Sequence, residues 1–183
     1  MPLTVESKRI SRQTLAVWWG IRGREDLLAA LTWIEQGGHR QQFSSVGEHV
    51  SKLSLEESKR LVSSLNAEDA NSVVIARRYY QALGQKGITG WDYSRYINLC
   101  RWGYASGYLS EEEAWEFIMS AASILRSTFS SWQELGENYL IGREFWSLDQ
   151  TQKDGQLMQA AYKRLLNNAS SPWNRIPWAL SLE

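Results

Sequence analysis

The chain has 183 residues, and its 20 lysines and arginines balance its 20 aspartates and glutamates. It therefore lacks the basic excess of a nucleic-acid binder, and its length favours one domain over residues 1–183 at about 150 residues per domain. One cysteine, no apolar run of about 18 residues and no apolar signal-peptide core at the N-terminus predict a cytoplasmic protein without a membrane partner.

Helix signals follow one another along the chain, and strand signals are nearly absent. A short apolar segment at 11–20 precedes a helix at 24–36, which the glycine pair 37–38 ends, and a weaker helix at 41–53. A capping box at 54–57 begins a helical region that continues through 68–83. Further helices are predicted to begin near residues 89, 110, 131 and 151, each of which is a serine or threonine that can cap a helix start.

The tail after Asn167 differs from the rest of the chain because Pro172 and Pro177 forbid a regular helix through it. Its apolar residues Trp173 and Trp178 predict that it folds back onto the body. No internal repeat or long linker divides the chain. We therefore predict an all-α fold, a single compact helical domain of about eight or nine helices, with an irregular C-terminal tail that contains tryptophan and proline.

Tryptophan is unusually common, with ten residues against eight tyrosines and four phenylalanines. Its large apolar body and single N–H suit either a core with satisfied indoles or a binding surface. In the predicted helix after residue 110, the apolar residues share one face. The members of that face are Ala114, Trp115, Ile118, Ala121, Ala122, Leu125 and Phe129.

Motifs of known catalytic sites are missing. The chain has no nucleophile elbow, P-loop or dinucleotide fingerprint. His39 and His49 are ten residues apart without a cysteine pair, so we predict no metal site and no cofactor. Cys100 lies mid-helix beside Leu99 and is predicted to be a core residue. These absences favour a protein that is not an enzyme, and they leave that question open.

The predicted helix at 91–104 places polar groups among indoles on one side. An arc of about 60° holds Trp91, Arg95, Asn98 and Trp102. Such groups need partners, which are either a buried ion pair or a ligand that is an anion or a planar ring. Asp92 suits the dipole at a helix start, or it pairs with Arg95 or Arg143.

The predicted helix at 131–146 carries an arginine inside an apolar stripe. The stripe consists of Trp132, Leu135, Tyr139, Arg143 and Trp146. An unpaired charge there costs several kcal/mol, so Arg143 either pairs with Asp92, Glu112 or Glu116 or clamps a ligand. Gly142 beside it indicates a close backbone approach.

His39 and Arg40 follow the glycine pair that ends a predicted helix. Two potential cations interact favourably with a helix C-terminus, which is the structural interpretation. In the functional interpretation they serve as a general base and an anion clamp.

Several short motifs follow one another in order, and together they resemble the bacterial domain-of-unknown-function family 1266 over about residues 15–148. The resemblance implies an all-α bacterial cytoplasmic protein whose motif residues meet in space, and it supplies no reaction. It leaves the last helix and the tail, 149–183, unconstrained. The motifs are Trp19-Gly20-Ile21, Gly38-His39-Arg40, Trp91-Asp92-x-x-Arg95, Gly107-Tyr108, Glu113-Ala114-Trp115, Ser131-Trp132 and Asn138-Tyr139-Leu140-x-Gly142-Arg143-x-x-Trp146.

Three hypotheses for the function follow. The first is a non-enzymatic interaction protein, of the immunity or antitoxin type, whose partner is another protein and whose surface exposes tryptophan or tyrosine. The second is a protein or enzyme that binds a small anionic or aromatic ligand or a nucleotide. In the third, the polar cluster only fixes helix packing. The pocket of the second hypothesis combines His39, Arg40, Trp91, Asp92, Arg95, Tyr139, Arg143 and Trp146.

Overall fold

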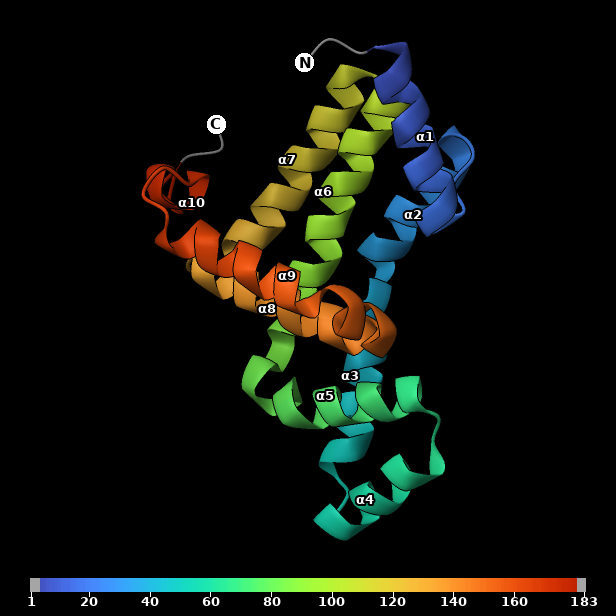
Figure 1. Ribbon diagram of the computed structural model, residues 1–183, viewed down its shortest axis with the longest axis vertical. Helices are drawn as coiled ribbons and strands as arrows, with labels where there is room; N and C mark the ends of the chain where they lie inside the picture. Colours follow the sequence, from blue (N-terminus) through green and yellow to red (C-terminus); the bar gives the residue numbers. More distant parts are fainter. Residues whose placement is uncertain (1–3, 181–183) are drawn as a thin grey trace. The chain divides into compact units, whose positions relative to one another are not determined.

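The computed structural model describes residues 4–180, and this part of the chain is all-α, as predicted (Figure 1). None of its helices is long and apolar enough to cross a membrane. The helices are α1 (Val5–Trp19), α2 (Arg24–Gln36), α3 (Gly38–Ser51), α4 (Leu55–Ser64), α5 (Ala67–Leu83), the 3₁₀ turn η1 (Gly84–Lys86), α6 (Thr89–Ser106), α7 (Glu111–Thr128), α8 (Trp132–Trp146), α9 (Leu148–Asn167) and α10 (Pro172–Arg175).

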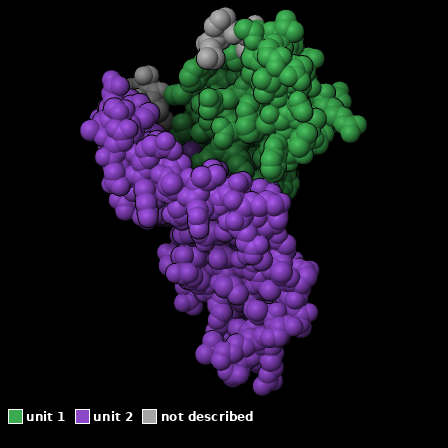
Figure 2. All heavy atoms as spheres, in the orientation of Figure 1, with its two compact units in different colours: residues 1–38, 93–124, 182 green, residues 39–92, 125–181, 183 purple. Residues whose placement is uncertain are grey.

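The described residues form two compact units, which Figure 2 colours separately. Unit 1 contains residues 4–38 and 93–124, and unit 2 contains residues 39–92 and 125–180. Helices α6 and α7 contribute residues to both units. That residues 1–183 form one domain stays a prediction.

The capping box predicted at 54–57 begins α4. The Ser54 hydroxyl accepts a hydrogen bond from the Glu57 N–H, and the Glu57 carboxylate accepts one from the Ser54 N–H at 2.8 Å. The helical region reaches residue 83, as predicted, but it is interrupted, because α4 ends at Ser64 and the Asn66 side chain caps a new helix, α5. The chain therefore turns between two capped helices where the sequence analysis predicts continuity.

Replacing this cap is expected to weaken the fold by a modest, measurable amount. Ser54→Ala should lower the free energy of unfolding by about 1 kcal/mol, because the Glu57 N–H loses its acceptor. Urea denaturation followed by circular dichroism measures it. The control is Ser63→Ala on the same helix: that hydroxyl only bonds back to the Lys59 carbonyl, so no loss is expected. Equal losses for the two variants would contradict the capping role.

The buried face of α7 is narrower than the sequence predicts. Ala114 and Ala121 are 4% and 1% exposed, whereas Trp115 is 57% exposed. Ala121 lies about 20° from Ala114 around the helix and Trp115 lies about 100° from it, so the indole falls outside the buried arc. The prediction that Trp115 shares this apolar face is wrong.

Cys100 lies in the interior of unit 1, as predicted. Its side chain is fully buried, and burial raises the pKa of the thiol to about 12. A thiol in that state is protonated at neutral pH and is a poor nucleophile. The residue therefore acts in packing.

The core of unit 2 forms where α3, α5, α6 and α8 supply apolar side chains. Phe43 packs edge-on against Phe145 with ring centroids 5.2 Å apart. The core cluster consists of Phe43, Val50, Val73, Ile75, Ala76, Ile88, Trp91 and Phe145. Helix α9 adds no fully buried residue to it, so this helix lies on the surface of the unit.

The C-terminal tail packs back onto unit 2, as its apolar residues predict. The Trp132 indole N–H donates to the Ile176 carbonyl at 2.8 Å, and the Trp178 indole N–H donates to the Phe129 carbonyl at 2.9 Å. The rings of Trp132 and Trp173 stack with an interplanar angle of 12°. The indoles thus combine apolar contact with hydrogen bonds to backbone that is not in a helix ladder.

Candidate functional site

The eight predicted site residues fall into separate groups. Arg95 belongs to unit 1, and the other seven belong to unit 2. Within unit 2 the structure forms one group around Asp92, a second around Trp91 and a third around Arg143. Each group is described below from its contacts.

Asp92 is fully buried, and its carboxylate accepts hydrogen bonds from the first turn of α3. The His39 N–H donates to Oδ1 at 3.2 Å, and the Arg40 N–H donates to Oδ2 at 2.9 Å. The Arg40 guanidinium lies 3.3 Å from Oδ2, and His39 Nδ1 lies 3.8 Å from Oδ1. The carboxylate therefore caps α3, where the exposed N–H groups and the helix dipole both favour an anion.

The sequence analysis treats Asp92 and the His39–Arg40 pair as separate features, and the structure brings them into contact. Asp92 lies in the first turn of α6, as predicted, but its side chain stabilises the start of α3. His39 and Arg40 follow the end of α2, as predicted, and they also lie in the first turn of the next helix, α3. Gly38, with φ of +52°, adopts the left-handed backbone conformation that glycine favours.

The second group is aromatic. Trp91, 4% exposed, packs against Tyr139 with ring centroids 5.1 Å apart and against Trp146 at 5.5 Å. The predicted close approach at Gly142 is confirmed here. A Cβ atom at Gly142 would lie only 2.2 Å from the Cβ of Trp91, so α8 needs a glycine where it passes α6.

Arg143 joins α8 to the beginning of α9. Its guanidinium is largely buried, donates to the Gln150 carbonyl at 2.9 Å and lies 3.7 Å from the Asp154 carboxylate. The predicted partners, Asp92, Glu112 and Glu116, are therefore wrong. Helix α9 begins at Leu148, before the predicted start at residue 151, and so brings Asp154 back alongside α8.

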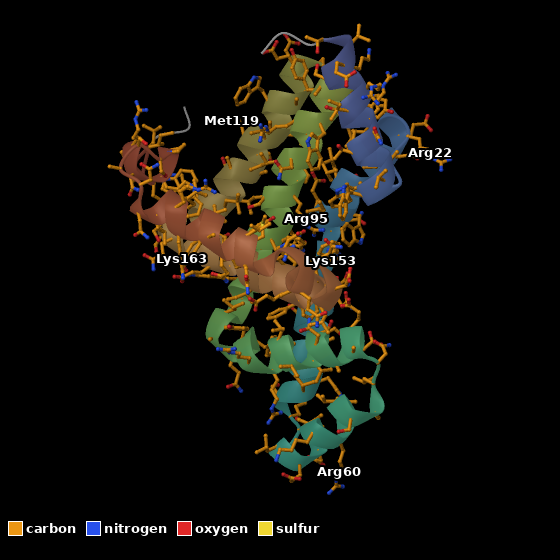
Figure 3. The ribbon with its side chains drawn as sticks, viewed as in Figure 1. Arg22, Arg60, Arg95, Met119, Lys153 and Lys163 are labelled. Atoms are coloured by element: carbon orange, nitrogen blue, oxygen red, sulfur yellow. The ribbon has the colours of Figure 1, made fainter. Side chains whose placement is uncertain are left out.

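Arg95 makes its contact within unit 1. Its guanidinium carbon lies 5.1 Å from the ring centroid of Trp19, which is a cation–π geometry, and Figure 3 labels it on α6. The motif Trp19-Gly20-Ile21 therefore meets the motif that contains Arg95. This is one instance in which motif residues distant in sequence come together.

The comparisons with known proteins agree with the predicted resemblance. Residues 14–178 match the family described as "Protein of unknown function (DUF1266)". The chain belongs to this family. The match reaches beyond the predicted limit of residue 148 and includes α9 and the tail as far as residue 178.

Two curated relatives come from Escherichia coli (strain K12). The "Uncharacterized protein YbeR" is 29% identical over 129 residues, which are 70% of this chain and 54% of YbeR. The "Uncharacterized protein YbeU" is 25% identical over 142 residues, which are 78% of this chain and 60% of YbeU. The chain thus matches between half and two thirds of the length of these relatives. No solved structure matches it.

The sequence analysis misses two polar residues that organise unit 2. The buried Asn138 accepts from the Gly90 N–H and donates to the Gly87 carbonyl, both at 2.8 Å, so it closes the start of α6. Arg77 donates to the carbonyls of Val50 and Leu53 and thereby holds the end of α3. Asn138 could have been found, because it lies inside a quoted motif and interrupts an apolar helix face.

The contacts given above are those of helix caps and interhelix clamps. In residues 4–180 no group of three or more histidine, cysteine, aspartate or glutamate side chains is placed to hold a metal ion. The polar atoms of Asp92 and Arg143 engage backbone groups of α3 and α9, respectively. The geometry therefore favours a structural role for this predicted site.

Proposed function

We propose that the chain is a non-enzymatic interaction protein that binds another protein through the outer face of α1. One observation carries the proposal: Ile10, Val17 and Trp18 are 50%, 70% and 59% exposed on this one helix. Large apolar side chains that gather on an exposed helix face mark interaction sites more often than isolated ones do. Tryptophan is also enriched among the residues that dominate binding energy.

The three side chains form one strip. At 100° per residue, Val17 and Trp18 lie about 20° and 80° to either side of Ile10, so the strip spans an arc of about 100°. The buried side of α1 borders the strip, because Ser11 lies about 20° beyond Trp18 and Leu15 about 60° beyond it. An amphipathic helix with anchors at these spacings is suited to lie in the groove of a partner.

The apolar character of the strip, rather than its charged neighbours, suggests the chemistry of the partner. At the same 100° per residue, Glu6 lies about 20° beyond Val17 and pairs with Arg9 at 2.7 Å, whereas Lys8 and Arg12 lie on the opposite side of α1. A partner with an apolar groove would complement the strip. A bacterial cytoplasmic toxin neutralised by an immunity or antitoxin-type protein is the narrower form of this proposal.

The roles of Asp92 and Arg143 add support. The alternative, a ligand pocket or active site, needs His39, Asp92, Arg95 and Arg143 to converge on one cavity. Asp92 caps α3 and Arg143 clamps the start of α9, so their charges already have partners in the fold. Binding through an exposed helix face requires none of these groups.

Trp18→Ala tests the proposal directly. We expect it to weaken binding of the partner by about 2 kcal/mol or more, roughly 30-fold, with an unchanged melting temperature because the indole is exposed. The wild-type chain is first used to recover a stoichiometric partner from lysate of the native host. Calorimetric titration of that purified partner then compares the variants.

The matched control is Trp115→Ala on α7, because Trp115 is almost equally exposed, at 57%. It should bind as the wild type does. If both variants bind equally well, or if Trp18→Ala melts well below the wild type, α1 is not the binding face.

A further inference from the structure

A second surface feature, independent of α1, lies on unit 2. A cavity of about 450 Å³ opens along α9 and the end of α8, within the size range of ligand sites. The residues that the argument uses are Glu144, Thr151, Gly155, Gln156, Gln159 and Lys163. Figure 3 labels Lys163 on α9. None of these residues belongs to the predicted site.

Two opposite charges line this cavity without pairing. Glu144 and Lys163 make no side-chain hydrogen bond or ion pair with any residue between 4 and 180, and so they do not contact each other. Glu144 is half-buried, and this burial raises the pKa of its carboxyl, while Arg78 and Arg143 act in the opposite direction. A half-buried carboxylate without a donor is costly and is stabilised by a ligand that brings one.

Gly155 keeps the cavity open. The other glycines inside the helices of unit 2 are required by packing: Cβ atoms at Gly47, Gly90, Gly136 and Gly142 would lie 2.3, 2.8, 2.6 and 2.2 Å from neighbouring side chains. A Cβ at Gly155 would meet only the Thr151 Cγ2, at an ordinary 3.5 Å. Glycine costs about 1 kcal/mol relative to alanine in a helix, and here no packing contact explains it.

The other polar groups of the cavity indicate which kind of ligand it would bind. The Thr151 hydroxyl donates to the Ser147 carbonyl at 2.8 Å, which leaves its lone pairs to accept. Together with the Glu144 carboxylate it offers acceptors for an ammonium or guanidinium group. Lys163 follows Thr151 by 12 residues, about 18 Å along α9, and offers a cation for an acid group. The Gln156 and Gln159 amides lie between, and they suit peptide groups.

We propose that this cavity binds a small zwitterion of short-peptide size, with its cationic group at Glu144 and its carboxylate towards Lys163. A single ion would satisfy only one of the two charges. A chain of about three residues extends roughly 10 Å, and the flexible lysine side chain covers the remaining distance. The proposal does not depend on the function proposed for α1.

Calorimetric titration of the full chain with the N-acetylated tripeptide acetyl-Arg-Gly-Gly, which carries one cation and one carboxylate, tests it. Two analogues isolate the charges: one has citrulline in place of arginine, and the other has an amidated C-terminus. Each analogue should bind the wild type about 10-fold or more weakly, since each loses a charge-assisted hydrogen bond. Glu144→Gln should abolish the preference for arginine over citrulline, and Lys163→Gln the preference for acid over amide.

Gly155→Leu provides a variant that fills the cavity without disturbing the fold, and it should abolish binding at an unchanged or higher melting temperature. Lys153→Gln is the matched control, because Lys153 pairs with Asp149 on the same helix and does not line the cavity; it should bind as the wild type does. The proposal is overturned if acetyl-Arg-Gly-Gly gives no binding at millimolar concentration, or if Gly155→Leu binds it normally. Trp18→Ala should bind the peptide unchanged, which separates this site from α1.

Discussion

Gly142→Ala is expected to lower the free energy of unfolding by about 3 kcal/mol. The added methyl group would lie 2.2 Å from the Trp91 Cβ, 2.7 Å from its Cγ and 3.2 Å from the Ile88 Cβ. Trp91 cannot move aside easily, because Tyr139 and Trp146 pack against its ring. The overlap therefore forces α8 away from α6, and overpacking of this kind outweighs the gain in helix propensity.

Gly155→Ala is the matched control for this prediction. It makes the same chemical change inside a helix of the same unit, where the new methyl meets only a methyl at 3.5 Å. It should raise the free energy of unfolding by about 1 kcal/mol through helix propensity alone. Urea denaturation of both variants measures the contrast, and equal effects would show that α6 and α8 do not approach as closely as described.

Asp92→Ala should be the most destabilising change at the predicted site, by about 3–5 kcal/mol. It removes the acceptor of the His39 and Arg40 N–H groups and leaves the Arg40 guanidinium without this carboxylate. Removing one partner of a buried ion pair has a cost of this size. Asp92→Asn keeps one oxygen for the cap and should lose less, about 1–3 kcal/mol.

Glu56→Ala is the control for the loss of a carboxylate. Glu56 pairs with Lys59 on the exposed side of α4, where such a pair contributes at most about 1 kcal/mol. Thermal and urea denaturation compare the variants. An Asp92→Ala protein that unfolds like the wild type would remove the structural explanation and would return Asp92 to the list of functional candidates.

Much of the local structure follows from short sequence signals. The Ser54–Glu57 capping box and the glycine that ends α2 at residue 37 act within a few residues of themselves, and both mark helix boundaries in the structure. The packing of the tail is also predictable from its tryptophans, while its prolines limit helix there to the short α10, which begins at Pro172. The boundary between α4 and α5 is harder to see, since its only signal is the cap at Asn66.

The candidate site is less predictable. Periodicity places Arg143 inside an apolar stripe and so establishes that it needs a partner, but it does not say which carboxylate comes near. That depends on where α9 begins and on how it turns back along α8. Trp115 illustrates the same limit, because its apolar character does not reveal how wide an arc of α7 is covered.

The amino-acid sequence by itself determined the all-α class, most helix starts, the packing of the tail and the need for a glycine at position 142. These properties depend on backbone propensity, capping and helical periodicity, which act over one or two turns. Only the tertiary structure decided that Asp92 caps α3, that Arg143 meets Asp154 and that the strip on α1 faces outward. Those facts depend on which helix faces meet, and distant residues settle that together through packing.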